Sequence, residues 1–232
     1  MSKDGLRDEW EDVQNVLSQV IPVYDKVNKV ISLWQDVSYR THGVRKGIRK
    51  GDFVLDAGCG PGVMSEILLK EHPDASIILF DPIRAMLEVA GNRVGIGRSL
   101  VSGVFENLPF PDGTFDAVMC GYSIRDAKQL ENALLEISRI LKPQGGRLVI
   151  VDLGKPDNYV LRMAVGAYWH YVVPILATMR VGRRGMLFSA LYKTYRRHPK
   201  NSDFKRILQS IFREVKFETR TLGASAIITA SK

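Results

Sequence analysis

The sequence predicts an α/β fold in which a mostly parallel sheet is covered by helices on both faces. Apolar runs alternate with helix-like segments through the central part of the chain, an order typical of parallel sheets. The first apolar run ends in the glycine-rich turn DAGCGPG (residues 56–62), and a helix-like segment follows it. The next run ends in a second acid, Asp81, roughly 20 residues on, a spacing typical of strand–helix–strand units.

Helices are expected before the sheet, over residues 8–48, as an N-terminal cap (residues 1–48). Apolar residues recur there at helical spacing, and Pro22 then interrupts the chain. The recurring residues are Val13, Val16, Leu17, Val20 and Ile21. A second amphipathic helix is expected over residues 23–34. Gly43 and Gly47 are expected to break a third segment before the first strand.

The ligand-binding core of this α/β fold is expected over residues 51–153. Its strands are predicted at residues 53–57, 76–81, 99–104, 115–120 and 146–152, and its helices at residues 62–71, 82–92 and 129–141. Ligands of such sheets bind beyond the carboxyl ends of the strands, at the topological switch point. Gly58, Asp81, Val104 and Gly121 fall at such ends, so distant parts of the chain are predicted to meet at one pocket.

The stretch after the fifth strand is predicted to cover that pocket, as a helical insertion over residues 157–200. Residues 163–179 are the most apolar of the chain and border on the 17–25 residues that span a bilayer. His170 and Pro174 argue against a span. The chain then closes with a helix at residues 201–211, capped by Ser202, and with strands at residues 215–222 and 224–230 in an antiparallel hairpin. The whole chain, residues 1–232, is predicted to be one domain.

Composition narrows the class of protein. The chain has 232 residues, 45% hydrophobic and 25% charged, which are ordinary globular values. A net charge of +8 suits RNA, an anionic membrane surface or an acidic ligand. The two cysteines, Cys59 and Cys120, have a spacing that suggests neither a zinc site nor a redox pair. The polar N-terminus has no signal-peptide core, so a reducing, cytoplasmic location is expected.

The glycine turn is compatible with two classes of cofactor site. Dinucleotide-binding folds use G-x-G-x-x-G, whose third glycine permits close packing of helix and strand. Here the glycines alternate as G-x-G-x-G, and Val63 stands where that third glycine would be. Asp56, two residues before the first glycine, fits the S-adenosylmethionine (SAM) site of class I methyltransferases better. A tight turn without a ligand is the structural alternative.

Further motifs make the resemblance specific. DAGCGPG (56–62), Asp81, ENLPFP (106–111), FDAV (115–118) and LKPQGGRL (141–148) resemble the class I SAM methyltransferase motifs in their usual order. More narrowly, the chain resembles the ubiquinone/menaquinone-biosynthesis C-methyltransferases. The residues that carry this narrower resemblance are Tyr24, Asp25, Asn28, Ser32, the run Ile124-Arg125-Asp126, Tyr171, Pro174 and the stretch from Leu191 to Pro199.

The resemblance implies a Rossmann-like, mostly parallel sheet of seven strands with SAM as methyl donor and no metal. It implies a set of cofactor-binding residues, namely Tyr24, Asp56, Gly58, Gly60, Pro61, Asp81, Pro82, Ile83, Val104, Phe105 and Gly121. Asp81 would hold the ribose, and Gly121 would border the methionine end. The chain departs from the family at three positions. Val104 replaces a polar residue, Gly121 replaces a common serine, and Asp126 replaces the asparagine after the arginine.

Four residues are candidates for the chemistry. Methylation of an aromatic carbon needs a ring hydroxyl to ionise, hence a positive group near the oxygen and a base for the ring proton. Arg125 is the candidate for orienting the hydroxyl, and a structural ion pair with Asp126 or Asp25 is its alternative role. Asp25, Tyr122 and His170 are weaker candidates for proton transfer.

The function predicted is C-methylation of a prenylated quinol precursor. A phospholipid methyltransferase is the closest rival, and an RNA methyltransferase or a non-catalytic SAM-binding protein is less favoured. No nucleic-acid partner is expected, because no appended RNA-binding module or base-methylation motif is visible. The apolar stretch and the basic residues after it suit peripheral contact with an anionic membrane, from which a lipophilic aromatic substrate would be taken. A homodimer is left open as an assembly.

Overall fold

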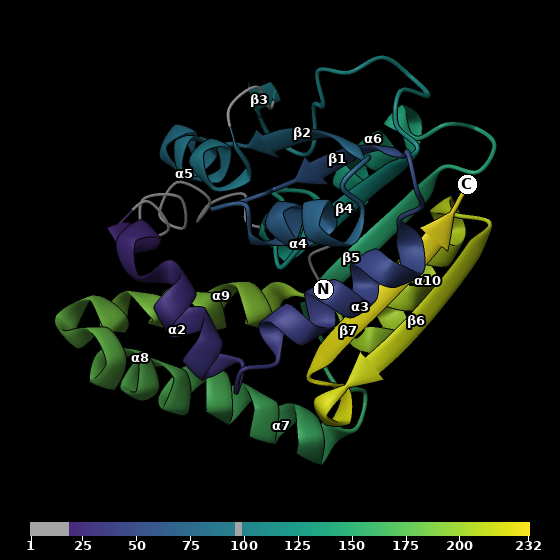
Figure 1. Cartoon of the computed structure of the whole chain (residues 1–232). Helices are drawn as coiled ribbons and strands as arrows, with labels where there is room; N and C mark the ends of the chain where they lie inside the picture. The colour runs from purple at the N-terminus through teal and green to yellow at the C-terminus, as the bar shows by residue number, and fades with distance from the viewer. Residues whose placement is uncertain (1–18, 96–98) are drawn as a thin grey trace.

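The computed structural model describes residues 19–95 and 99–232, and Figure 1 shows its arrangement. The expected helix around Val13, Val16 and Leu17 lies outside the described residues. Seven strands form one sheet in the order β3-β2-β1-β4-β5-β7-β6. The strands are β1 (Phe53–Ala57), β2 (Ser76–Asp81), β3 (Ser99–Ser102), β4 (Ala117–Gly121), β5 (Arg147–Leu153), β6 (Glu214–Arg220) and β7 (Ser225–Ser231). The predicted α/β class, with its C-terminal antiparallel hairpin, is confirmed.

Strands β1 to β5 run parallel, and β7 pairs antiparallel with both β5 and β6. The strand order reverses at β1, because β2 follows β1 on one side and β4 lies on the other. The carboxyl ends of β1 and β4 therefore border the topological switch point, where ligands of such sheets bind.

Helices cover both faces of the sheet. They are α3 (Asp36–Gly47), α4 (Val63–Glu71), α5 (Arg84–Val94), α6 (Leu130–Ile140) and α10 (Asn201–Ile211). One apolar core joins the sheet to α6 and α10 through residues such as Leu134, Phe204 and Leu208. A second core joins the other face to α3, α4 and α5 through Val44, Met64 and Leu87. Figure 1 shows α3 and α4 in front of the sheet and α6 and α10 behind it.

The expected break of α3 at its glycines is wrong, because α3 runs unbroken from Asp36 to Gly47. Both glycines face the sheet. A Cβ at Gly43 would lie 2.7 Å from Val151 Cγ2, and one at Gly47 would lie 2.1 Å from Val149 Cγ2. These glycines therefore allow the helix to approach the sheet closely, and they do not end it.

The helix before α3, α2 (Tyr24–Ile31), ends earlier than expected, because Leu33 and Trp34 adopt positive φ.

A third layer caps the carboxyl ends of the strands. The insertion after β5 contains α7 (Tyr159–Ala167), a π-helical turn (Tyr168–Val172), α8 (Val173–Val181), a 3-10 segment (Gly182–Ser189) and α9 (Ala190–Arg197). Trp169, Val173 and Phe188 share an apolar core with Val27 and Ile31 of α2. In Figure 1, α2 crosses this insertion beside the sheet.

The π-helical turn and Pro174 are linked. Pro174 has no N–H to donate, and the N–H of Val173 donates five residues back to Tyr168 O. The widened turn keeps α7 and α8 in one continuous rod. By length and composition alone, residues Tyr159–Arg197 are apolar enough to cross a membrane. The chain, however, turns at Gly182, and α9 returns alongside α7 and the π-helical turn.

One local expectation fails at the last helix. Lys200 is the N-cap residue of α10, and it makes no side-chain capping hydrogen bond. Ser202 is not the cap that was predicted, because it lies inside the helix and its hydroxyl donates to Asp157 Oδ1 at 2.6 Å. The helix is therefore tied to the loop before α7 through Asp157.

Candidate functional site

A cavity of about 410 Å³ lies between the sheet and the helical cap. Its floor is formed by the turns that follow β1, β2 and β4, and its walls by α2, α3, the insertion and the β6–β7 turn. All eleven positions that the resemblance assigns to cofactor binding line it, as do Arg125 and Tyr122. Residues from nearly the whole chain are thus brought to one site.

The glycine turn after β1 is built from left-handed backbone. Gly58, Gly60 and Gly62 all have positive φ, which other residues adopt only with strain. The N–H groups of Gly58 and Cys59 donate to Phe80 O and tie the turn to β2. A Cβ on Gly58 would lie 2.5 Å from Ser123 Cβ, whereas one on Gly60 would meet nothing within 4 Å. The backbone at Gly60 is therefore open to a ligand.

Asp81 holds that turn in place. One carboxylate oxygen accepts from Gly60 N and the other from Ile83 N, each at 2.8 Å. Burial raises the pKa of Asp81 to about 6, although both hydrogen bonds oppose the shift. Each oxygen keeps a second lone pair, so the carboxylate can still accept from the hydroxyls of a ribose.

Asp56 presents an unsatisfied acceptor to the site. Ser65 donates to Asp56 Oδ2, whereas the buried Oδ1 has no hydrogen-bond partner. Burial raises the pKa of Asp56 to about 7, and the hydrogen bond from Ser65 and the charge of Arg40 oppose the shift. A buried acceptor without a partner is costly, and a cationic ligand group would satisfy it.

The sequence reasoning missed Arg40, which lines the cavity from α3. Its guanidinium is bound to Asp36 Oδ2 at 3.0 Å and lies 4.5 Å from the centre of the Tyr122 ring. Arg40 is 3% exposed, and its buried Nε has no hydrogen-bond partner. The only signal in the sequence was the i,i+4 spacing of Asp36 and Arg40, which is also typical of a solvated helix face.

At the end of β4, the backbone of Gly121 lies close to the side chains of Met64 and Arg40. A Cβ on Gly121 would lie 2.8 Å from Met64 Sδ and 3.4 Å from Arg40 Nε, so the serine common in the family would displace its neighbours here. Tyr122 follows with a positive φ of 62°, a conformation that is strained for a tyrosine. Burial raises the pKa of Tyr122 well above its ordinary value, so its phenol remains protonated at neutral pH.

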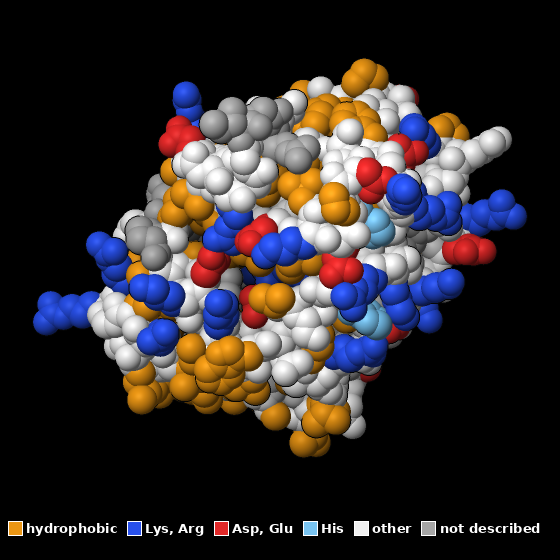
Figure 2. Space-filling model, viewed as in Figure 1, with side chains coloured by type: hydrophobic (Ala, Val, Ile, Leu, Met, Phe, Trp, Pro, Cys, Tyr) orange, Lys and Arg blue, Asp and Glu red, His pale blue; other side chains and the backbone are white. Residues whose placement is uncertain are grey.

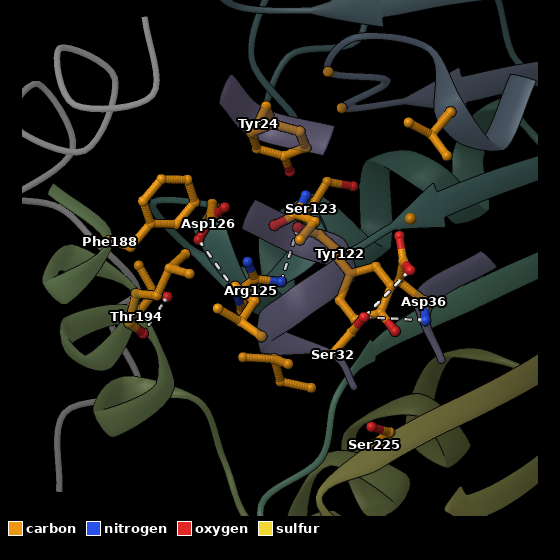
Figure 3. Close-up of a pocket in the computed structure, with 18 of the residues that line it drawn as sticks. Tyr24, Ser32, Asp36, Tyr122, Ser123, Arg125, Asp126, Phe188, Thr194 and Ser225 are labelled. Carbon is orange, nitrogen blue, oxygen red and sulfur yellow. Dashed lines mark hydrogen bonds and ion pairs between the residues drawn. The ribbon is translucent and has the colours of Figure 1, made fainter. Parts of the chain in front are cut away.

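The other half of the cavity is apolar, with one cation at its base. Arg125 is buried, with 5% of its side chain exposed, and its Nη1 donates to Tyr122 O at 2.8 Å. The same nitrogen forms an ion pair with the fully buried Asp152. Burial alone would lower the pKa of Arg125, but the charges of Asp152 and Asp126 raise it. In Figure 3, Arg125 lies centrally, between Tyr24, Tyr122, Asp126 and Thr194.

Two of the predicted catalytic residues are not brought to the cavity. Neither Asp25 nor His170 is among its lining residues. Asp25 forms an ion pair with Arg93, which also approaches Glu66 at 3.8 Å. His170 lies on the exposed side of the π-helical turn. The centre of its ring lies 4.3 Å from that of Tyr171 and 4.5 Å from that of Tyr192. The arrangement leaves Arg125 and Tyr122 at the site.

A family model and individual sequences similar to this chain all indicate the same family. The sequence model of the ubiE/COQ5 methyltransferase family matches residues 4–232. A demethylmenaquinone methyltransferase of Symbiobacterium thermophilum is 30% identical, over 95% of this chain and 92% of its own length. The ubiquinone/menaquinone biosynthesis C-methyltransferase UbiE of Geobacter sulfurreducens is also 30% identical, over 98% of this chain and 91% of its own length.

Solved structures support the fold. A SAM-dependent methyltransferase of Thermotoga maritima, described as a possible histamine N-methyltransferase, aligns with a TM-score of 0.67. The alignment covers 95% of this chain and 99% of that one at 18% identity. A SAM-dependent methyltransferase of Aquifex aeolicus aligns with a TM-score of 0.57, over 89% and 96% of the two chains, at 18% identity. At such identities the likeness concerns the fold alone.

Proposed function

Since the chain belongs to the ubiE/COQ5 methyltransferase family, we propose that it transfers a methyl group from SAM to a ring carbon of a prenylated quinol. It is a SAM-dependent methyltransferase, as its family and its relatives are. The observation that supports the quinol is the division of the cavity. One half has the glycine turn with Asp56 and Asp81, and the other is mainly apolar, with Arg125 and Asp126 at its base.

The residues present fit SAM, which supplies an electrophilic methyl group on a sulfonium when it is bound. Asp56 Oδ1 and Arg40 Nε are buried and lack hydrogen-bond partners, and both residues line the cavity. We infer that Asp56 accepts from the ammonium of the methionine part and that Arg40 donates to its carboxylate. Asp81 would accept from the ribose, with Ile83, Val104 and Phe105 beside the adenine.

The apolar half suits a ring with a hydrocarbon tail. Its walls are side chains of α2, the insertion and the β6–β7 turn, among them Ile31, Leu161, Val165, Trp169, Phe188 and Leu191. A ring bound between this half and the glycine turn would have Arg125 below it. The guanidinium is always charged, so it would stabilise the developing oxyanion of a ring hydroxyl and make the adjacent carbon more nucleophilic.

The outer face of the insertion supports uptake of such a substrate from a membrane. Exposed apolar side chains follow α7, the π-helical turn and α8, namely Tyr159, Val160, Met163, Tyr171, Ile175 and Met179. Exposed arginines follow at positions 180, 183 and 184. Figure 2 shows hydrophobic side chains gathered along the lower edge, where Figure 1 draws α7 and α8, with Lys and Arg beside and above them. An apolar face flanked by positive charge suits an anionic bilayer surface.

The proposal is tested with methyl-labelled SAM and three acceptors in parallel: a prenylated naphthohydroquinone, phospholipid vesicles and total RNA. Label is expected in the quinol, on a ring carbon, and mass spectrometry of the product locates it. Label in a phospholipid headgroup or only in RNA would replace the proposed acceptor while leaving SAM as the donor. No transfer to any acceptor, with SAM still bound, would favour a protein that has lost its activity.

A further inference from the structure

Two buried polar groups meet at the base of the apolar half without a hydrogen bond. Asp126, at the end of the short turn Ile124–Asp126, lines the cavity with 20% of its side chain exposed. Its Oδ1 lies 3.7 Å from Arg125 Nε, beyond hydrogen-bond distance. Both atoms are buried and neither has another hydrogen-bond partner. An acceptor atom and a donor atom thus lie side by side, each with its hydrogen-bonding capacity unused.

A hydroxyl satisfies such a pair, and a carbonyl does not. A hydroxyl oxygen can accept from Arg125 Nε–H and donate its own hydrogen to the Asp126 carboxylate. A carbonyl oxygen can accept from Arg125, but it then faces a carboxylate that offers only lone pairs. Placing two acceptors together leaves Asp126 Oδ1 without a hydrogen bond, and sites of this kind reject analogues that lack the hydroxyl.

We propose that Asp126 makes the site select the reduced, hydroxyl-bearing form of the ring over its oxidised, carbonyl-bearing form. This inference rests on the proposed function and adds a residue that determines specificity. A reduced ring is also the form that can become nucleophilic, because its hydroxyl can ionise whereas the oxidised ring has none. Discrimination in binding would keep the unreactive form out of the site.

The surroundings keep Asp126 an acceptor at neutral pH. Burial raises its pKa to about 6, and the charges of Asp152 and Asp81 add to the shift. The charge of Arg125 and a hydrogen bond from the Thr194 hydroxyl oppose it. Asp152 is fully buried, is not among the residues that line the cavity, and accepts from Arg125 and from Leu153 N. The Tyr24 phenol, whose pKa is raised by burial, remains a protonated donor. Of the two aspartates beside Arg125, Asp126 is therefore the one that can meet the ligand's ring.

The family's asparagine at this position supplies the matched test. An amide offers an oxygen that accepts and an NH₂ that donates, so it can satisfy a hydroxyl or a carbonyl. Asp126→Asn keeps the size and shape of the side chain and removes the discrimination. The variant is expected to remain folded and to bind both forms of the ring.

The experiment measures binding, with 2-geranyl-1,4-naphthoquinone and its dithionite-reduced hydroquinone as probes. Calorimetry under argon, with S-adenosylhomocysteine present to prevent turnover, gives a dissociation constant for each form. The natural protein is expected to bind the hydroquinone about tenfold or more tightly than the quinone. In Asp126→Asn that ratio is expected to fall to about threefold or less, mainly through tighter binding of the quinone.

Asp112→Asn makes the same chemical change at a carboxylate that is 80% exposed, and it should keep the natural ratio. Asp126→Ala, which leaves neither donor nor acceptor, should lose the preference as the amide does and serves if the amide variant fails to fold. A natural protein that binds both forms equally, or an amide variant with the natural ratio, would overturn the inference and leave the acceptor class standing. If the natural protein bound neither form, the proposed acceptor would fail and the inference with it.

Discussion

The charged residues at the base of the cavity depend on one another for their stability. Arg125 and Asp152 form an ion pair in which the arginine side chain is 5% exposed and the aspartate fully buried. Removing one member of such a pair leaves an uncompensated charge, which costs more than the pair contributes. The arginine that is proposed to act on the substrate therefore also has a structural role, and the two roles must be separated by experiment.

Arg125→Met is expected to lower the free energy of unfolding by about 3–5 kcal/mol, because Asp152 loses its counter-ion. The double variant Arg125→Met/Asp152→Asn should recover part of that loss, since residue 152 then carries no charge. Urea denaturation of the natural protein, both single variants and the double variant gives the coupling between the two residues. Methyl transfer should stay impaired in the double variant, and full activity there would mean that Arg125 has no role beyond the ion pair.

The affinity for SAM should depend on pH through Asp56. Without ligand, burial raises the pKa of Asp56 to about 7, so the carboxyl is protonated below that pH. The ionised form is the one that binds an ammonium, so affinity is lost as the pH falls through about 7. From pH 7.5 to 5.5 the dissociation constant should rise about 20- to 30-fold, and binding should release protons near pH 6.

Calorimetry in buffers of different ionisation enthalpy measures both quantities. Asp56→Asn should bind SAM more weakly and with a flatter pH dependence. In the ligand-free protein the raised pKa of Asp56 affects the free energy of unfolding, and it does so in the opposite direction from the SAM affinity. The contribution of Asp56 to stability is fully present below its ordinary pKa and is lost as the pH rises through about 7. A natural protein whose SAM affinity stayed constant from pH 5.5 to 7.5 would contradict the role given to Asp56.

At the scale of the elements, α3 shows how a helix can depend on its glycines. Glycine is the least favourable helix residue after proline, so Gly→Ala in an exposed helix is stabilising. In α3 the missing side chains are what allow contact with β5. Gly47→Ala is therefore expected to destabilise the protein by about 1–3 kcal/mol, as overpacking does, despite the gain in helix propensity.

Thermal and urea unfolding measure the effect, and two variants control it. Gly166→Ala in α7 would bring its Cβ no closer than 3.8 Å to Tyr195, so this change should be neutral or stabilising. Adding Val149→Ala to Gly47→Ala should recover stability, because it removes the atom that the new methyl group meets. If Gly47→Ala were as stable as the natural protein, the close packing of α3 would not be needed.

The same helix explains which elements could be predicted from the sequence. β1, β2 and α10 were predicted at their observed bounds, because their apolar periodicity agrees with their packing. A glycine carries two meanings, a turn or a close approach, and only the tertiary contacts decide between them. The left-handed residues Leu33 and Trp34, which end α2 early, also carry no local signal, because neither residue favours positive φ.

At the scale of the whole molecule, the site was predictable where a motif fixes a residue to the end of a strand. Asp56, Asp81 and Gly121 meet because parallel strands bring their carboxyl ends to one edge. Arg40 and Phe188 reach the same cavity from a helix and from the insertion. The positions of these two side chains depend on how the helices pack on the sheet. No local sequence pattern predicts that packing. His170 was considered for its chemistry, but the phase of its helix turns it to the outside.

The helical insertion also gives the molecule a face with exposed apolar side chains. Ile175 and Met179 lie one turn apart on α8, with 60% and 80% of their surfaces exposed, and neither lines the cavity. Ile175→Glu/Met179→Glu should weaken binding to phosphatidylglycerol-rich vesicles about tenfold or more, because it replaces apolar contact by charge facing an anionic surface. Vesicle co-sedimentation measures the binding, which should also weaken as salt is raised.

Stability and SAM affinity should not change in that variant, since both side chains are already in water. Leu135→Glu places a single glutamate on α6, at a residue that is 55% exposed, and it should bind vesicles as the natural protein does. With a detergent-dispersed quinol all three proteins should have equal turnover, whereas with quinol embedded in vesicles only the α8 variant should be slow. Equal turnover with embedded quinol would mean that the substrate reaches the cavity without this face.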